Sequence, residues 1–108
     1  MNRPFRLTRR AQGSLVDIAI WTIQTFGPRQ ADLYETTLIE CCEAIARGDS
    51  ISQSCALLAP EAHDLRFARA GGHFVVFLER PDEVIVVDIL HSRSDLARHV
   101  AALQAIKE

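Results

Sequence analysis

The sequence predicts a single α+β domain over residues 1–108, in which a helical hairpin packs on a small, mostly antiparallel sheet. Apolar residues recur at helical spacing in the first half of the chain, whereas the second half contains short runs rich in β-branched and aromatic residues. The composition, 48% apolar and 24% charged, is typical of globular proteins. The expected order of elements is β-α-α-β-β-β-α.

A short strand and a long helix are expected at the N-terminus. In "RPFRLT" (3–8) apolar residues alternate with polar ones, which is the pattern of a half-buried strand. Thr8 is then placed to cap a helix over about 9–26. The apolar positions near a 3.6-residue period, expected to face the core, are Ala11, Leu15, Ile18, Ala19 and Phe26.

The stretch "FGPRQ" separates this helix from a second one. Gly27 can end the first helix, and Pro28 is preorganised for the first turn of the next. The second helix is expected over about 28–47 and ends at Gly48. Two long helices with almost no linker must form an antiparallel hairpin. One face of the second helix carries Ala31, Tyr34, Leu38, Cys41, Cys42 and Ile45.

Three strands are expected in the second half, at residues 63–70, 73–79 and 83–90. Gly71-Gly72 is suited to a tight hairpin turn, and Pro81 in "RPDE" occupies the position that a type I turn favours. The last two strands are apolar on both faces, so we expect them in the centre of the sheet.

Two further segments complete the chain. Residues 48–61 are polar, contain glycine and proline, and are expected to form an irregular connection. Residues 95–106 are expected to form a short helix that Ser94 or Asp95 caps. Its apolar stripe consists of Leu96, Val100, Leu103 and Ile106.

Composition argues against several classes of protein. The formal net charge is −2, so the basic excess that drives nucleic-acid binding is missing, and no direct binding to nucleic acid is expected of the chain alone. Three cysteines without framework spacing argue against a disulfide scaffold. No apolar segment is long enough to span a bilayer, and the N-terminus lacks the apolar core of a signal peptide. We therefore expect a cytoplasmic protein that does not contact a membrane.

The sequence does not predict a metal centre or a cofactor. The four histidines lack the close helical spacing of a zinc site, and no cysteine pair accompanies them. A serine nucleophile is not indicated, because there is no glycine-flanked nucleophile turn. "AGGH" is followed by a predicted strand rather than a helix, which argues against a phosphate-binding loop.

Basic side chains lie near the ends of the predicted strands. Arg66 and Arg69 belong to the first strand of the C-terminal half, His73 begins the next, and His91 and Arg93 follow the last. Neighbouring ends in an antiparallel sheet lie close together, so several of these cations can meet at one rim. Two interpretations stay open: a solvated rim with weak exposed ion pairs, or a site that recognises phosphate or the acidic residues of a partner.

Trp21 lies about a third of a turn away from the apolar stripe of the first helix. It is suited either to packing at the edge of the core or to partial exposure as an interface anchor. The sequence leaves both possibilities open.

Four stretches together resemble the ParE branch of the RelE/ParE toxins, which are the toxin halves of type II toxin-antitoxin modules. They are "IWTIQTFGPRQADLYETTL", "LR" at 65–66, "GGHFVVFLE" and "VVDILHSRSDLARHV", and they cover nearly the whole chain in order. The "FGxxQAxxY" motif is matched by Phe26, Gly27, Gln30, Ala31 and Tyr34. The "ILHxRxD" motif is matched by Ile89, Leu90, His91, Arg93 and Asp95.

The resemblance implies a helical hairpin on an antiparallel sheet and a choice between two activities. RelE-like members cleave mRNA on the ribosome with Lys, Arg and usually a C-terminal Tyr, whereas ParE-like members poison DNA gyrase. The sole Lys here is Lys107 and the sole Tyr is Tyr34, so the residues favour a gyrase inhibitor without catalytic residues. An endoribonuclease that uses His91, Arg66 and Arg93 is the alternative, and a member that binds its antitoxin without toxicity is a third.

By the same resemblance, a ParD-like antitoxin neutralises the chain and forms a hetero-oligomer with it. The residues expected to bind this antitoxin are Trp21, Arg66, Arg69, His73 and Arg93. Gly27, Pro28 and Asp95 are expected to have structural roles, with His91 and Arg93 closing the last strand and Asp95 orienting the C-terminal helix.

Overall fold

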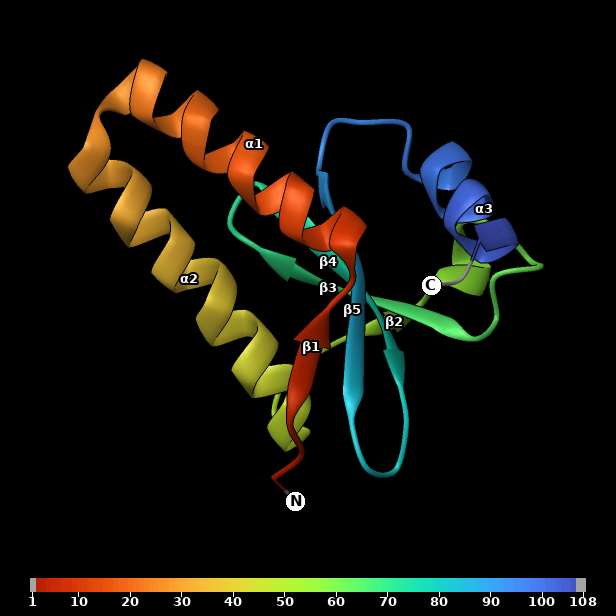
Figure 1. The fold of residues 1–108 in the computed structure, drawn as a ribbon. Coiled ribbons are helices and arrows are strands. Elements are labelled where there is room, and N and C mark those ends of the chain that lie inside the picture. Colours follow the sequence, from red (N-terminus) through yellow and green to blue (C-terminus); the bar gives the residue numbers. More distant parts are fainter. Residues whose placement is uncertain (1, 107–108) are drawn as a thin grey trace.

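The computed structural model describes residues 2–106, which form a mixed sheet with helices on both faces (Figure 1). The helices are α1 (Arg9–Phe26), α2 (Pro28–Arg47) and α3 (Leu96–Ile106). The strands are β1 (Phe5–Leu7), β2 (Gln53–Ser54), β3 (Leu65–Ala70), β4 (His73–Glu79) and β5 (Val84–His91). None of the helices among these residues is long and apolar enough to cross a membrane.

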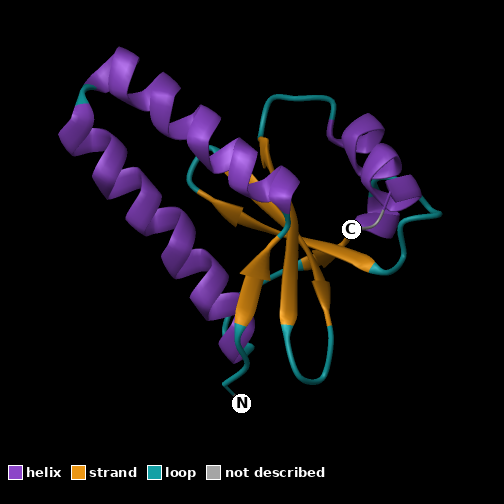
Figure 2. Ribbon diagram, viewed as in Figure 1, coloured by secondary structure: helices purple, strands orange, loops and turns teal. Residues whose placement is uncertain are grey.

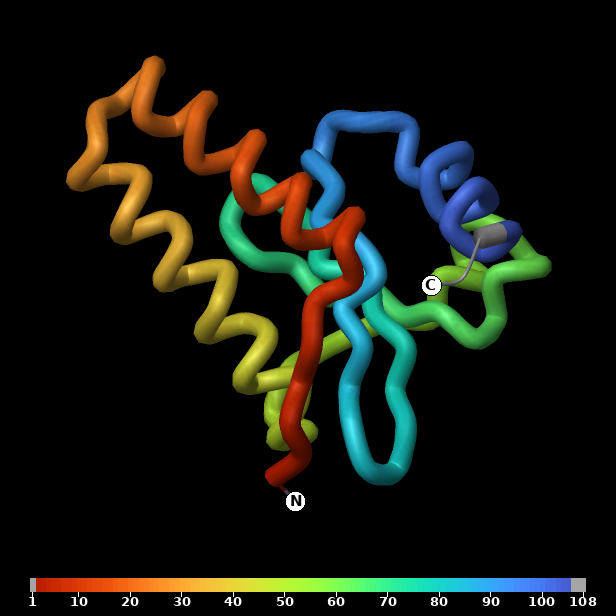
Figure 3. Tube along the Cα trace, viewed as in Figure 1, coloured from red at the N-terminus to blue at the C-terminus, as the bar shows by residue number. Residues whose placement is uncertain are grey.

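The strand order in the sheet is β1-β5-β4-β3-β2, so the two most apolar strands lie inside it, as predicted. All neighbours are antiparallel except β1, which pairs in parallel with β5. The chain trace shows how β5 returns to lie beside the N-terminal strand β1, from which both long helices and the strands β2, β3 and β4 separate it in the sequence (Figure 3).

The helical hairpin has the predicted bounds. Thr8 caps α1, because its Oγ1 accepts a hydrogen bond from Ala11 N at 3.1 Å and donates one to Val87 O at 2.7 Å. Gly27 has φ 95° and separates the two helices, and Gly48 ends α2 in the left-handed conformation. These backbone angles suit glycine and explain why the hairpin turns at this point.

Two predictions are wrong, one about residues 48–61 and one about Phe26. Residues 48–61 are not wholly irregular, because β2 pairs with β3 and a 3-10 turn follows at Cys55–Leu57. A two-residue strand carries no periodic pattern, so only its pairing reveals it. Phe26 does not face the core: its side chain is 63% exposed. The tip of the hairpin extends past the sheet (Figure 2), and Phe26 there meets the ring of Trp21 instead of the core.

Each face of the sheet has its own apolar core. The hairpin packs on one face, and α3 with the segment after β2 packs on the other (Figure 1). The largest fully buried side chains are Phe77, Leu38, Leu65 and Ile85. The predicted stripe of α3 is buried at Val100 and Leu103, whereas the side chain of Ile106 lies outside the described part of the structure, as does Lys107.

Candidate functional site

A groove lies between the hairpin and the adjoining ends of β4 and β5. It consists of two neighbouring cavities of about 310 and 290 Å³, and His73 and His91 line both of them. The half toward the middle of α1 is also lined by Asp17, Ile18 and Trp21. The half toward α2 is lined in addition by Trp21, Thr22, Phe26, Gln30, Tyr34 and Gly72.

Strand register places the two histidines side by side. His73 begins β4 directly opposite His91, which ends β5. Both belong to the sheet face that the hairpin covers, because Val75 and Ile89, two residues away on each strand, pack in that core. The ring centroids are 5.1 Å apart with an interplanar angle of 79°. An imidazole pair therefore forms the floor of the groove.

Tyr34 connects α2 to this pair. Its hydroxyl oxygen lies 2.6 Å from His73 Nδ1 and accepts a hydrogen bond of 2.9 Å from Gly72 N. Burial raises the pKa of Tyr34, an effect that the Gly72 N–H partly opposes. Burial also lowers the pKa of His73, and the neighbouring His91 adds to the effect. At neutral pH the Tyr34–His73 contact is therefore between two uncharged groups.

The outer wall of the groove is aromatic and exposed. Trp21 is 58% exposed, lies at the surface and meets Phe26 edge to face with ring centroids 5.8 Å apart. Further exposed apolar side chains continue along the hairpin: Val16, Ile20, Ile23 and Leu33. An exposed apolar surface of this kind on a small domain is typical of a protein-binding face.

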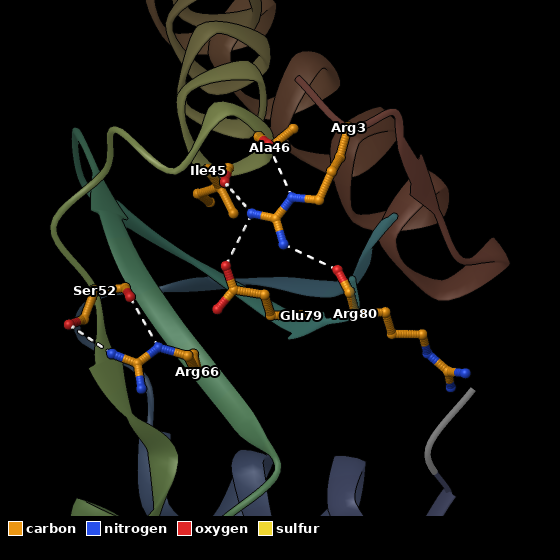
Figure 4. A network of polar contacts seen from close by, with 7 residues as sticks. All are labelled: Arg3, Ile45, Ala46, Ser52, Arg66, Glu79 and Arg80. Carbon is orange, nitrogen blue, oxygen red and sulfur yellow. Dashed lines mark hydrogen bonds and ion pairs between the residues drawn. The ribbon is translucent and has the colours of Figure 1, made fainter. Parts of the chain in front are cut away.

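The predicted arginines do not all meet at one rim. Arg66 is four residues before Ala70, whose cross-strand partner is His73, so it lies about 13 Å away along the strand. Its guanidinium donates to Ser52 Oγ and Ser52 O at 2.9 and 3.0 Å (Figure 4). Arg69 is exposed and lies 5.6 Å from the Phe74 ring centroid.

The loop after β5 is ordered by local hydrogen bonds. Arg93 N donates to His91 Nδ1 at 3.0 Å, and Ser94 Oγ donates to His91 O at 2.6 Å. Asp95 Oδ1 accepts from Arg98 N at 3.2 Å, which is the contact of an N-cap, so Asp95 rather than Ser94 caps α3.

The geometry brings together some of the predicted residues and adds others. Trp21 and His73 share the groove with His91, whereas Arg66 and Arg69 do not line it. Sequence reasoning missed the contribution of Tyr34, Gln30, Thr22 and Asp17. Gln30 and Tyr34 belong to the "FGxxQAxxY" motif, whereas the signal for Thr22 and Asp17 was only their position on the first helix opposite the strand ends. Among residues 2–106, no group of three or more His, Cys, Asp or Glu side chains is arranged to hold a metal ion.

These features define a class of protein: a small α+β domain with an exposed apolar hairpin and a groove beside it. The family model described as the ParE toxin of the type II toxin-antitoxin system parDE matches residues 5–96. The chain therefore belongs to the ParE toxin family.

A solved structure agrees with this fold. The chain is similar to one in the chromosomal ParDE toxin-antitoxin system from P. aeruginosa, with 15% identity and a TM-score of 0.68. The match covers 82% of this chain and 95% of that one. No curated protein sequence matches the chain.

Proposed function

We propose that this ParE toxin inhibits DNA gyrase in the cytoplasm and is neutralised by a ParD-like antitoxin. The choice of target rests on one observation about the residues that the alternative endoribonuclease would use, His91, Arg66 and Arg93: Arg66 lies apart from His91. Arg66 lies about 13 Å along the sheet from the row that holds His91. Its guanidinium donates hydrogen bonds to Ser52, and Arg66 is not among the residues that line the groove. A ribonuclease needs these cations around one phosphate, so their separation favours a protein inhibitor.

One observation favours the endoribonuclease as a second candidate. Two imidazoles 5.1 Å apart in an open groove could act as acid and base on one ribose phosphate. However, no Arg or Lys is among the residues described as lining either cavity, and Asp17 lines one of them. A dianionic transition state would meet no cation among these lining residues, which makes this candidate the weaker one.

The exposed face of α1 supports antitoxin binding. Val16, Ile20 and Ile23 follow one another at helical spacing and are largely exposed. An amphipathic segment of a partner would cover this stripe in the manner of a helix in a groove. Trp21 and His73 belong to the adjoining groove, and we propose them as antitoxin contacts with Arg66, Arg69 and Arg93.

The deciding experiment is induction of the chain alone in bacteria, with separate measurements of chromosome breaks and transcript integrity. A gyrase inhibitor produces double-strand breaks and an SOS response while transcripts stay intact. The His91→Ala variant should retain this toxicity, because the proposed function gives His91 no catalytic role.

Cleaved transcripts without chromosome breaks, together with a harmless His91→Ala variant, would establish the ribonuclease instead. Normal growth with abundant folded protein would indicate a member without toxicity. Co-expression of the small protein encoded beside the toxin tests neutralisation, and restored growth is the expected result.

A further inference from the structure

The groove holds two imidazoles whose Nε2 atoms contact no hydrogen-bond partner among residues 2–106. His91 Nδ1 accepts the Arg93 N–H, so the neutral ring carries its proton on Nε2. Residues 2–106 provide no acceptor for that Nε2. A donor at the floor of an open groove is available to an occupant.

The same assignment follows for His73. Gly72 N already donates to the Tyr34 oxygen, so the phenol hydrogen is free to be donated. The phenol hydrogen has two acceptors within reach, His73 Nδ1 at 2.6 Å and Ala70 O at 3.3 Å. The shorter contact favours donation to His73 Nδ1, the arrangement that places the His73 proton on Nε2. In that arrangement both rings, 5.1 Å apart at the groove, carry an N–H at Nε2.

The half of the groove toward α2 suits an anionic group on an apolar stem. Its lining contains no acidic residue, and Gln30 adds an amide that can donate. Asp17 lines only the other half and is exposed to solvent. The walls beside the donors are the rings of Trp21 and Phe26, which would pack against methylene groups.

We propose that this half of the groove binds the carboxylate of one Asp or Glu side chain of the antitoxin, with His73 Nε2 and His91 Nε2 each donating to it. The inference rests on the proposed antitoxin function and names the chemistry of one contact within it. The occupant is the antitoxin because Trp21 and Phe26, which wall the site, are part of the exposed apolar surface of the hairpin. A segment bound on that surface would adjoin the cavity that Trp21, Phe26, His73 and His91 line together.

A double-mutant cycle with the antitoxin encoded beside the toxin tests the contact. On the toxin, His91→Phe removes the donor and keeps a ring, whereas His91→Gln retains an N–H near the Nε2 position. On the antitoxin, each Asp or Glu of the toxin-binding segment is changed in turn to Asn or Gln. We expect His91→Phe to weaken binding about 10- to 100-fold, the range for a hydrogen bond to a charged group. His91→Gln should restore most of the affinity.

One antitoxin carboxylate should show the coupling: its loss costs little once His91 is already Phe. His99→Phe, an exposed position on α3, is the matched control and should leave affinity unchanged. Equal affinities for wild type, His91→Phe and His91→Gln would overturn the inference and leave antitoxin binding intact. Failure of the antitoxin to bind the wild-type toxin at all would contradict the proposed function, and the inference with it.

A second measurement needs no antitoxin. Trp21 is the sole tryptophan, so its fluorescence reports directly on the groove wall. Phenylacetate should change this fluorescence saturably, and 2-phenylethanol, which has the same ring without the carboxylate, should not. Equal responses to the two probes, or an equal response to phenylacetate in His91→Phe, would show apolar binding without carboxylate recognition and would overturn the inference.

Discussion

The guanidinium of Arg3 lies 2.9 Å from the carboxylate of Glu79, although 76 positions separate them in the sequence (Figure 4). The same guanidinium donates to Ala46 O, Ile45 O and Arg80 O at 3.0, 3.3 and 2.9 Å. It thereby satisfies carbonyls at the end of α2 and joins that helix to the N-terminal segment and to the end of β4. Its side chain is only 11% exposed and that of Glu79 is 44% exposed, so solvent screens the part-buried contacts to Ile45 O and Ala46 O less than the ion pair.

The first prediction concerns this junction. Arg3→Met should lower the free energy of unfolding by about 2 kcal/mol, the range for lost hydrogen bonds to a charged group. Urea denaturation followed by circular dichroism measures the change. The matched control is Arg6→Met, because the Arg6–Glu83 pair is much more exposed and should cost about 0–1 kcal/mol. Equal losses for the two variants would contradict the role assigned to Arg3.

The second prediction concerns the turn beside Tyr34. Gly71 has φ 60°, and a Cβ built on it would lie 2.7 Å from Tyr34 Cε1. Gly71→Ala should therefore cost about 1–3 kcal/mol of stability and displace the phenol from His73. Gly72→Ala is the control, since its Cβ would be 3.8 Å from the Tyr34 oxygen, an ordinary contact. Urea midpoints of both variants test this, and a Gly71→Ala protein as stable as Gly72→Ala would refute it.

The third prediction concerns pH. The pKa of His73 is lowered in the folded chain by burial and by His91, so the unfolded chain binds more protons as the pH falls through about 6.5. The stability that depends on neutral His73 is thus present above that pH and is lost below it. His73→Phe should lose less stability than wild type between about pH 7.5 and pH 5.5 in urea titrations.

The exposed His99→Phe provides the comparison for that titration. It should follow the wild-type dependence on pH. If His73→Phe and wild type lose the same amount of stability on acidification, proton binding at His73 does not contribute to the pH dependence of stability.

The fourth prediction concerns the thiols. Burial raises the pKa of Cys42 and of Cys55 to about 12, and it also raises the pKa of Cys41, which is half-buried. Because the thiolate is the reactive form, iodoacetamide at about pH 8 should label Cys42 and Cys55 of the folded chain very slowly. Mass spectrometry of digests should show all three labelled after denaturation in urea. Prompt labelling of Cys55 in the folded protein would contradict its burial.

Sequence reasoning predicted the parts of this fold that local patterns encode. The bounds of α1 and α2 follow from Thr8, Gly27, Pro28 and Gly48, because caps and turns depend on a few neighbouring residues. The central position of β4 and β5 follows from runs that are apolar on both faces. The "FGxxQAxxY" and "ILHxRxD" motifs indicated the family that the family model then showed.

The groove could be predicted only in part. His73 and His91 were expected near each other because consecutive antiparallel strands share an end, and the register bears this out. The same argument failed for Arg66, which lies too far from the end of β3. Tyr34 was assigned to the core-facing stripe of α2, and only the packing of that helix shows its hydroxyl at His73.

The sequence by itself thus determined the elements other than β2, their order and the family, since periodicity, caps and turns act over a few residues. The tertiary structure decided that Trp21 and Phe26 are exposed, that Arg66 hydrogen-bonds Ser52, and that two imidazoles line a groove. These outcomes depend on how far the hairpin extends past the sheet and on strand register. Both are set by packing between distant segments, which no local pattern records.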